Sequence, residues 1–157
     1  MNSNGTVQVR FSVPQDGDPI IELMHATVLG GGKYRLENSP FYAYGVSFED
    51  VVSANSESEG IVFSKVVARG GHSTYRVKLP PDAESGNFLA VWPELESLGC
   101  TYEGSVAGSR PLYAIDVPPG CDIKAVYRIL ELREKDGTWE FEEAHYYAGD
   151  PIDRLVQ

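Results

Sequence analysis

The side chains most suited to chemistry in this 157-residue chain are three histidines, two cysteines and a serine that follows one of the histidines. His25, His72 and His145 each fall on a predicted strand or turn, and Ser73 or Cys100 could act as a nucleophile beside one of them. Such catalysis needs a nucleophile on a sharp turn and a carboxylate that orients the histidine, and no segment has that pattern. We therefore expect a protein that is not an enzyme.

Metal and cofactor sites are not predicted either. Glu142, Glu143 and His145 are metal-ligand types close together in sequence, but they lack the i, i+4 helical spacing of a zinc protease pair. Two cysteines are too few for a four-ligand zinc site or a disulfide framework. A hairpin between Cys100 and Cys121 would permit one disulfide, yet free thiols are expected in a reducing compartment. No metal and no cofactor is expected.

The net charge of −10 is concentrated in one half of the chain. Residues 80–157 hold fifteen acidic against six basic residues, whereas residues 1–79 hold eight against seven. Such a field attracts basic proteins and repels nucleic acid and anionic lipid. No apolar stretch approaches the roughly 20 residues that cross a bilayer, and the first residues do not have the pattern of a secretory signal. We expect a cytoplasmic protein that binds neither nucleic acid nor membrane.

The first half, residues 1–71, has the pattern of short strands and turns. Apolar residues alternate with polar ones from Val7 to Val13, and a second apolar run from Ile20 to Leu29 is interrupted by Glu22 and His25. Five or six such strands, separated by glycine and proline, predict a small barrel or sandwich. Gly70-Gly71 separates two β-rich runs and predicts a hairpin that bridges the two halves, with a flexible linker as the weaker alternative.

The second half, residues 72–149, has the order β-α-β-β-α-β of a ferredoxin-like unit, followed by a tail at 150–157. Pro93 either kinks the first helix or begins it, and Asp122 is expected to cap the second. Because the first and last strands of this topology are neighbours, Arg76 is expected near Glu142 on an open sheet face. Exposed pairs of that kind contribute only about 0.2 to 1 kcal/mol. An α+β protein with a barrel-like and a ferredoxin-like half is the predicted fold.

Several segments together resemble a bacterial family of domains of unknown function, family 4265. The more specific of them are the aromatic turn Ser-Pro-Phe-Tyr-Ala-Tyr-Gly-Val-Ser and the motif Gly-His-Ser-Thr. The family has no agreed activity, so the resemblance implies no catalytic residues and chiefly favours a bacterial cytoplasmic setting. The segments that carry the resemblance are residues 10–13, 22–23, 39–47, 50–52, 71–74, 98–100 and 115–118.

The acidic half leads to a first hypothesis: a non-enzymatic protein of the immunity or antitoxin type that covers a basic site on a toxin, plausibly a nuclease. The alternative is a small-molecule-binding regulatory module with its site between the halves, at Tyr42, Tyr44, His72 and Ser73. An enzyme is the third hypothesis. The residues predicted to bind the basic partner are Glu94, Glu96, Glu103, Glu140, Glu142, Glu143, Tyr146 and Tyr147.

Overall fold

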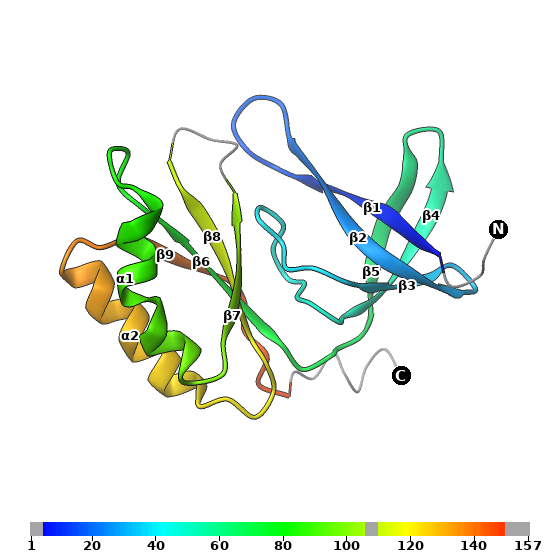
Figure 1. Cartoon of the computed structure of the whole chain (residues 1–157). Coiled ribbons are helices and arrows are strands. Elements are labelled where there is room, and N and C mark those ends of the chain that lie inside the picture. Colours follow the sequence, from blue (N-terminus) through cyan, green and yellow to red (C-terminus); the bar gives the residue numbers. More distant parts are fainter. Residues whose placement is uncertain (1–4, 106–109, 150–157) are drawn as a thin grey trace.

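The computed structural model describes residues 5–105 and 110–149, so the predicted tail at 150–157 lies outside the described residues. Within that part the chain is mostly β with two helices, which confirms the predicted α+β class. Strands β1 to β5 form one unit, and strands β6 to β9 with both helices form the other, beside it (Figure 1). No helix among the described residues is long and apolar enough to cross a bilayer.

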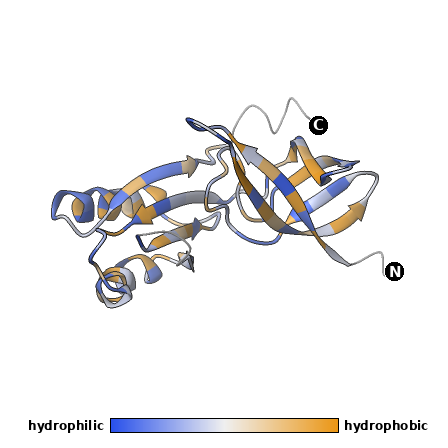
Figure 2. Ribbon diagram, turned by 90° about the horizontal axis from the view of Figure 1, so that it is seen from above, coloured by the Kyte–Doolittle hydropathy of each residue, from blue (hydrophilic) through white to orange (hydrophobic). Residues whose placement is uncertain are grey.

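The first unit is a closed five-stranded barrel in the order β1-β2-β3-β4-β5. Neighbouring strands are antiparallel except for β1 and β5, which close the barrel in parallel. Alternation explains its core, because Val9, Phe11 and Val13 of β1 point inward and pack with Met24 of β2. Bands of hydrophobic and hydrophilic residues alternate along these strands in Figure 2. The strands are β1 (Thr6–Val13), β2 (Ile20–Gly30), β3 (Lys33–Leu36), β4 (Val51–Glu57) and β5 (Gly60–Ala68).

The second unit is a four-stranded antiparallel sheet in the order β7-β8-β6-β9. Both helices lie on the face that is turned away from the barrel (Figure 1). Helix α2 begins as predicted, since the Asp122 carboxylate accepts a hydrogen bond from the Ala125 N–H at 3.1 Å. Helix α1 begins at Ser85, so Pro93 does not start it and lies inside it. The elements are β6 (Ser73–Lys78), α1 (Ser85–Glu96), β7 (Thr101–Ser105), β8 (Leu112–Val117), α2 (Ile123–Lys135) and β9 (Glu140–His145).

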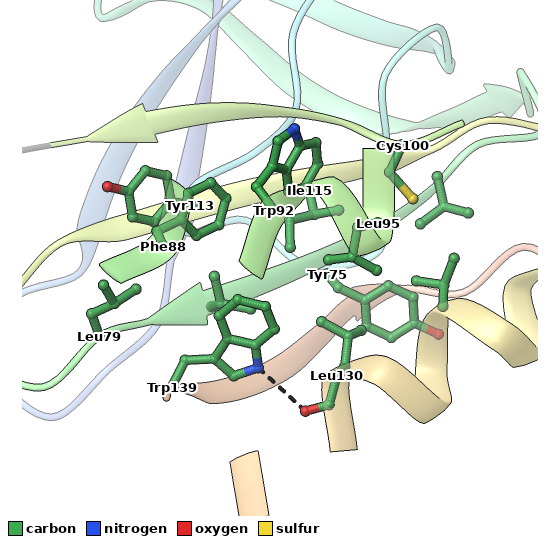
Figure 3. Packing of buried hydrophobic residues seen from close by; sticks show 13 residues of the cluster. Tyr75, Leu79, Phe88, Trp92, Leu95, Cys100, Tyr113, Ile115, Leu130 and Trp139 are labelled. Atoms are coloured by element: carbon green, nitrogen blue, oxygen red, sulfur yellow. Dashed lines mark hydrogen bonds between the residues drawn. The ribbon is translucent and has the colours of Figure 1, made fainter. Parts of the chain in front are cut away.

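The helices and the sheet enclose an aromatic core. The ring of Phe88 stacks on that of Tyr113 with centroids 3.7 Å apart, and Trp92 stacks on Phe88 at 5.4 Å (Figure 3). Trp139 faces the helices as predicted, and its indole N–H donates to the carbonyl of Leu130 at 3.2 Å. Buried aromatic rings each remove a large apolar area from water, so this core stabilises the second unit.

The predicted hairpin at Gly70-Gly71 is wrong. Strand β5 pairs with β4 and β1, and β6 pairs with β8 and β9, so the two glycines carry the chain from barrel to sheet. The glycines serve a different need. A Cβ on Gly70 would lie 2.7 Å from the carbonyl oxygen of Glu49, and Gly71 adopts a φ of +92°. Close packing against the β3–β4 loop therefore explains Gly70, and a positive φ in the crossing segment explains Gly71.

Candidate functional site

The most unusual feature of the molecule is a set of buried polar side chains between its two units, which we call the polar seam. The loop of residues 37–50, between β3 and β4, lies against the barrel-facing side of the four-stranded sheet through these contacts. Buried polar groups are costly unless they are paired, so each member must have a defined partner. The buried members of the seam are Glu22, Ser47, Asp50, Arg69, His72, Thr74, Arg76, Asp116 and His145, and the exposed residues Glu49 and Glu142 lie at its margin, in contact with His72 and Arg76.

Part of the loop is held between an anion from the barrel and a cation from the sheet. The Glu22 carboxylate of β2 accepts the backbone N–H groups of Phe41, Tyr42 and Ala43 at 2.6, 3.0 and 2.8 Å. From the other side, the Arg76 guanidinium donates to the carbonyl of Ala43 at 2.8 Å and to that of Tyr42 at 3.3 Å. At residues 41–43, the backbone N–H groups therefore bind a carboxylate of the barrel, and the carbonyl groups of Tyr42 and Ala43 bind a guanidinium of the sheet.

Arg76 does lie beside Glu142, as the strand order predicts, with Nε and Oε2 2.8 Å apart. The expectation of an open sheet face is wrong, however, because Arg76 is only 2% exposed. The loop covers it, and the Tyr44 ring lies 4.6 Å from its guanidinium carbon. Tyr44 also donates its hydroxyl to Glu142 at 2.7 Å, and this bond, with burial, raises the pKa of Tyr44.

Asp50 joins the loop to the segment that crosses between the units. One carboxylate oxygen accepts the Ser47 N–H and Arg69 Nη1, both at 2.9 Å, and the other accepts the Gly70 N–H at 2.9 Å. Asp50 is completely buried and Arg69 almost so. Because a buried charge without its partner is strongly unfavourable, this pair fixes the path of the crossing segment.

His72 lies between two carboxylates. Its Nδ1 is 2.8 Å from an oxygen of Asp116 on β8, and its Nε2 is 3.1 Å from Glu49 of the loop. Glu49 holds an uncommon left-handed backbone conformation, with φ of 70°. Burial raises the pKa of Asp116, an effect that the neighbouring His72 opposes. Since both ring nitrogens already face carboxylates, the imidazole has no free nitrogen with which to activate a nucleophile.

Two other arrangements have the composition of catalytic pairs. Ser47 Oγ lies 3.0 Å from His145 Nδ1 and 2.7 Å from Thr74 Oγ1, but Ser47 is 0% exposed and no substrate can reach it. Both cysteines are free thiols. Burial raises the pKa of Cys100 to about 12 and also raises that of Cys121, so neither is a thiolate near neutral pH. The geometry therefore favours structural roles for these groups.

A cleft of about 350 Å³ opens at the β7 edge of the seam, and we call it the seam cleft. One wall comes from the outer face of β2, with the half-exposed side chains of Ile21 and Leu23. Across it, Glu103 of β7 accepts the Ser39 N–H at 2.8 Å and so ties the edge of the sheet to the loop. The cleft is lined by Ile21, Glu22, Leu23, His25, Asn38, Phe41, Tyr42, Glu103 and Ser105.

The four residues of the predicted ligand site do not come together. Tyr42 lines the seam cleft, whereas Tyr44 contacts Arg76 and Glu142. His72 is buried between its two carboxylates. Ser73 accepts the Tyr147 N–H at 2.8 Å, and alternation along β6 puts it on the opposite face from its neighbours His72 and Thr74. The location between the units has a cleft, but only Tyr42 of the four belongs to it.

The residues predicted to bind a basic partner do not form one surface. Glu103 is on β7 and the three glutamates of β9 are at the opposite edge of the sheet, while Glu94 and Glu96 are on α1. Most are engaged within the molecule. Glu94 pairs with Arg133, Glu140 with Arg110 at 2.8 Å, and Glu142 with Arg76. Glu143 accepts the Tyr75 hydroxyl at 3.3 Å and, with Tyr146, lines another cavity; Tyr147 is half-buried and donates its N–H to Ser73.

Sequence reasoning missed the centre of the seam: Glu22, Glu49, Asp50 and Arg69. One signal was available, because Glu22 interrupts an otherwise apolar strand, and a carboxylate at such a position requires partners. The partners themselves lie 19 to 21 residues away in the chain, so local spacing could not identify them.

Fold and site together define a small α+β protein in which a closed barrel and a helix-backed sheet are joined by hydrogen bonds of largely buried polar side chains. The chain belongs to the family described as "Domain of unknown function (DUF4265)", whose profile matches residues 22–141. It is also similar in fold to a "hypothetical protein from Neisseria gonorrhoeae" of known crystal structure, with a TM-score of 0.74 and 13% identity over 91% of this chain and 98% of that one. No curated protein matches the sequence.

Proposed function

We propose that this chain is a non-enzymatic binding protein whose ligand occupies the seam cleft. The observation that carries the proposal is the cleft of about 350 Å³ whose walls come from both units. Ligand sites are commonly concave and located where structural units meet. The cross-contact between Glu103 and Ser39 keeps the two walls in register, so the cleft is already formed without a ligand.

The lining indicates the chemistry of the ligand. Leu23 and Ile21 present apolar surface, and Phe41 and Tyr42 add aromatic side chains. The carboxylates of the lining repel an anion, even though they already accept backbone N–H groups. We infer a ligand with an apolar body and a neutral or cationic polar end.

The test is a fragment screen by thermal shift, followed by mapping of the hits on the ¹⁵N-labelled protein. A compound that binds only the native form raises the melting temperature. Leu23→Ser should weaken such hits by about tenfold, since removing a buried apolar contact costs on the order of 1 to 2 kcal/mol. Leu29→Ser is the matched control, because Leu29 is a similarly exposed leucine of the same strand that does not line the cleft.

Hits whose perturbed resonances lie away from residues 21–25, 38–42 and 103–105 would contradict the proposal. So would equal binding by the Leu23→Ser and Leu29→Ser proteins.

A second candidate is the immunity- or antitoxin-like role, in which the acidic protein covers a basic site on a toxin, plausibly a nuclease. The net charge of −10 favours it, because a one-signed field accelerates association with a cationic partner. The internal ion pairs of Glu94, Glu140 and Glu142 weaken the case for those particular side chains. Glu96, which is exposed on α1, becomes the better residue to test.

Charge reversal separates the two candidates. Glu96→Lys should slow association with a basic protein co-purified from the native host and reduce the dependence of that rate on salt. Glu59→Lys, an equal charge change in the barrel half, is the control. If the Glu96→Lys and Glu59→Lys proteins associate with the basic protein at the same rate, Glu96 is not part of such an interface. If only Leu23→Ser weakens the binding of that partner, the seam cleft is the site.

We also propose that the second unit is ferredoxin-like and that the protein works in the bacterial cytoplasm. Support for the first comes from the strand order β9-β6-β8-β7 with two helices on one face. Support for the second comes from the two free cysteines, which suit a reducing compartment.

A further inference from the structure

A larger cavity, of about 470 Å³, lies on the helix-covered side of the sheet, and nothing in the proposed function uses it. It opens where the first half of α2 meets β6 and the end of β9. Its volume falls within the range of pockets that hold small molecules. We call it the tyrosine pocket, and its principal lining residues are Tyr75, Lys124, Tyr127, Arg128, Glu143 and Tyr146.

The aromatic surface of the pocket is partly open to solvent. Tyr127 and Tyr146 are 40% and 41% exposed, although large aromatic residues usually bury more of their area. Tyr75, which is fully buried, meets the ring of Tyr127 edge to face with centroids 6.2 Å apart and holds it in place. Two exposed tyrosines beside a hollow offer ring faces on which a planar group can pack.

The pocket also has cations that the molecule does not use internally. Lys124 and Arg128 are four residues apart on α2, so they share one face of the helix. Among the described residues neither of them forms an ion pair, whereas Arg35, Arg69, Arg76, Arg110 and Arg133 all do. Uncommitted cations next to a cavity are notable in a chain with a net charge of −10.

A guanidinium presents parallel N–H donors that match a carboxylate, sulfonate or phosphate, and an adjacent ammonium adds charge without geometric demand. Glu143, on the opposite wall, uses one oxygen to accept the Tyr75 hydroxyl. Its charge disfavours an anionic group on that side of the pocket, so an anion is directed toward α2.

We propose that the tyrosine pocket binds a small aromatic anion, with its ring against Tyr127 and Tyr146 and its acidic group on Arg128 and Lys124. This site is independent of the seam cleft, which lies on the other face of the sheet and is lined by different residues.

The experiment uses two fluorescent probes of nearly the same shape. One is 1-anilinonaphthalene-8-sulfonate, and the other is N-phenyl-1-naphthylamine, which lacks the sulfonate. With the folded full-length protein, the sulfonate should bind about tenfold more tightly, since it adds a charge-assisted contact that solvent screens only in part at this exposed site. Equal affinity for the two probes overturns the proposal.

Variants identify the pocket as the site. Arg128→Gln should remove most of the preference for the sulfonate, and Tyr127→Leu should weaken both probes severalfold. Arg10→Gln is the matched control, because Arg10 is on the barrel and likewise forms no ion pair among the described residues. If Arg128→Gln binds the sulfonate as the natural chain does, or if Arg10→Gln loses affinity equally, the assignment is wrong.

Leu23→Ser distinguishes failure of this proposal from failure of the proposed function. That variant should bind the sulfonate unchanged, because Leu23 belongs to the seam cleft. If Leu23→Ser loses affinity for the sulfonate, the probe binds in the seam cleft, and the tyrosine pocket is refuted as its site.

Discussion

The two faces of the four-stranded sheet are both covered, but by opposite chemistry. On the helix side, Tyr75 and Val77 of β6 join a core of aromatic and aliphatic side chains. On the barrel side, Thr74 and Arg76 of the same strand join the polar seam. Alternate residues of one strand thus face the hydrophobic core on one side and the polar seam on the other. All four of these side chains are almost completely buried.

The apolar and polar faces of the sheet constrain the structure in different ways. Apolar packing is non-directional, so a hydrophobic core tolerates changes of side chain that conserve volume. A buried ion accepts only an arrangement in which its partners are present, so the seam restricts how barrel and sheet can be oriented. We infer that the helix side supplies stability and the barrel side supplies orientation.

The largest effect is expected on the helix side. Phe88→Ala should lower the free energy of unfolding by about 4 kcal/mol, because it removes a fully buried ring and leaves a cavity. The measurement is urea denaturation followed by tryptophan fluorescence. Leu89→Ala, at the half-exposed neighbouring position, should cost less than about 1 kcal/mol. Similar losses in both variants would contradict this account of the core.

On the barrel side, Asp50→Ala should cost about 3 kcal/mol, since it leaves the Arg69 charge and two backbone N–H groups without their acceptor. Asp18→Ala, at an exposed turn, is the control and should be nearly neutral. Denaturation curves of the two proteins check the prediction. A loss below about 1 kcal/mol for Asp50→Ala would show that the seam is not held by this carboxylate.

A smaller loss is expected from the crossing segment. Gly70→Ala puts a Cβ against the backbone of Glu49, so the loop must shift, at a cost of about 2 kcal/mol. Gly86→Ala in the first turn of α1 meets open space and should be neutral or slightly stabilising. Melting temperatures of the two variants provide the comparison. If the two melting temperatures are equal, the close approach at Gly70 does not affect stability.

The smallest effect concerns pH. Because burial raises the pKa of Asp116 in the folded protein, its protonated form is favoured by folding, and that contribution is lost as the pH rises through the raised pKa. The stability of the natural chain relative to Asp116→Asn should therefore fall as the pH increases from about 4, the ordinary pKa of an aspartate. Unfolding free energies at several pH values test this. If the stability of the natural chain relative to Asp116→Asn instead rises as the pH increases, the prediction is wrong.

Local patterns predicted the helix side of the molecule well. The alternation around Trp139 and the cap at Asp122 follow from residues close in sequence. These features depend on periodicity and on side chains that satisfy nearby backbone groups, both of which a sequence displays directly. On the barrel side, only the neighbouring positions of Arg76 and Glu142 followed from strand order.

The seam was not predictable in the same way. Arg76 meets carbonyls 33 to 36 residues away, and the Ser47 and His145 side chains meet across 98 residues. Gly70-Gly71 was misinterpreted because Gly70 is needed for close approach to a distant backbone and Gly71 for a positive φ in the crossing segment, not for a hairpin. The ion pairs of Glu94 and Glu140 were not predictable for a related reason, since their arginine partners come from other elements.

A cleft with walls on two units can bind only if those units stay fixed, so the central claim is that the polar seam makes barrel and sheet one cooperative body. Differential scanning calorimetry of the full chain tests it most directly. The account predicts a single transition with a calorimetric to van't Hoff enthalpy ratio near one. Two separate transitions in the natural chain would mean that the seam does not hold the units together and would contradict the claim.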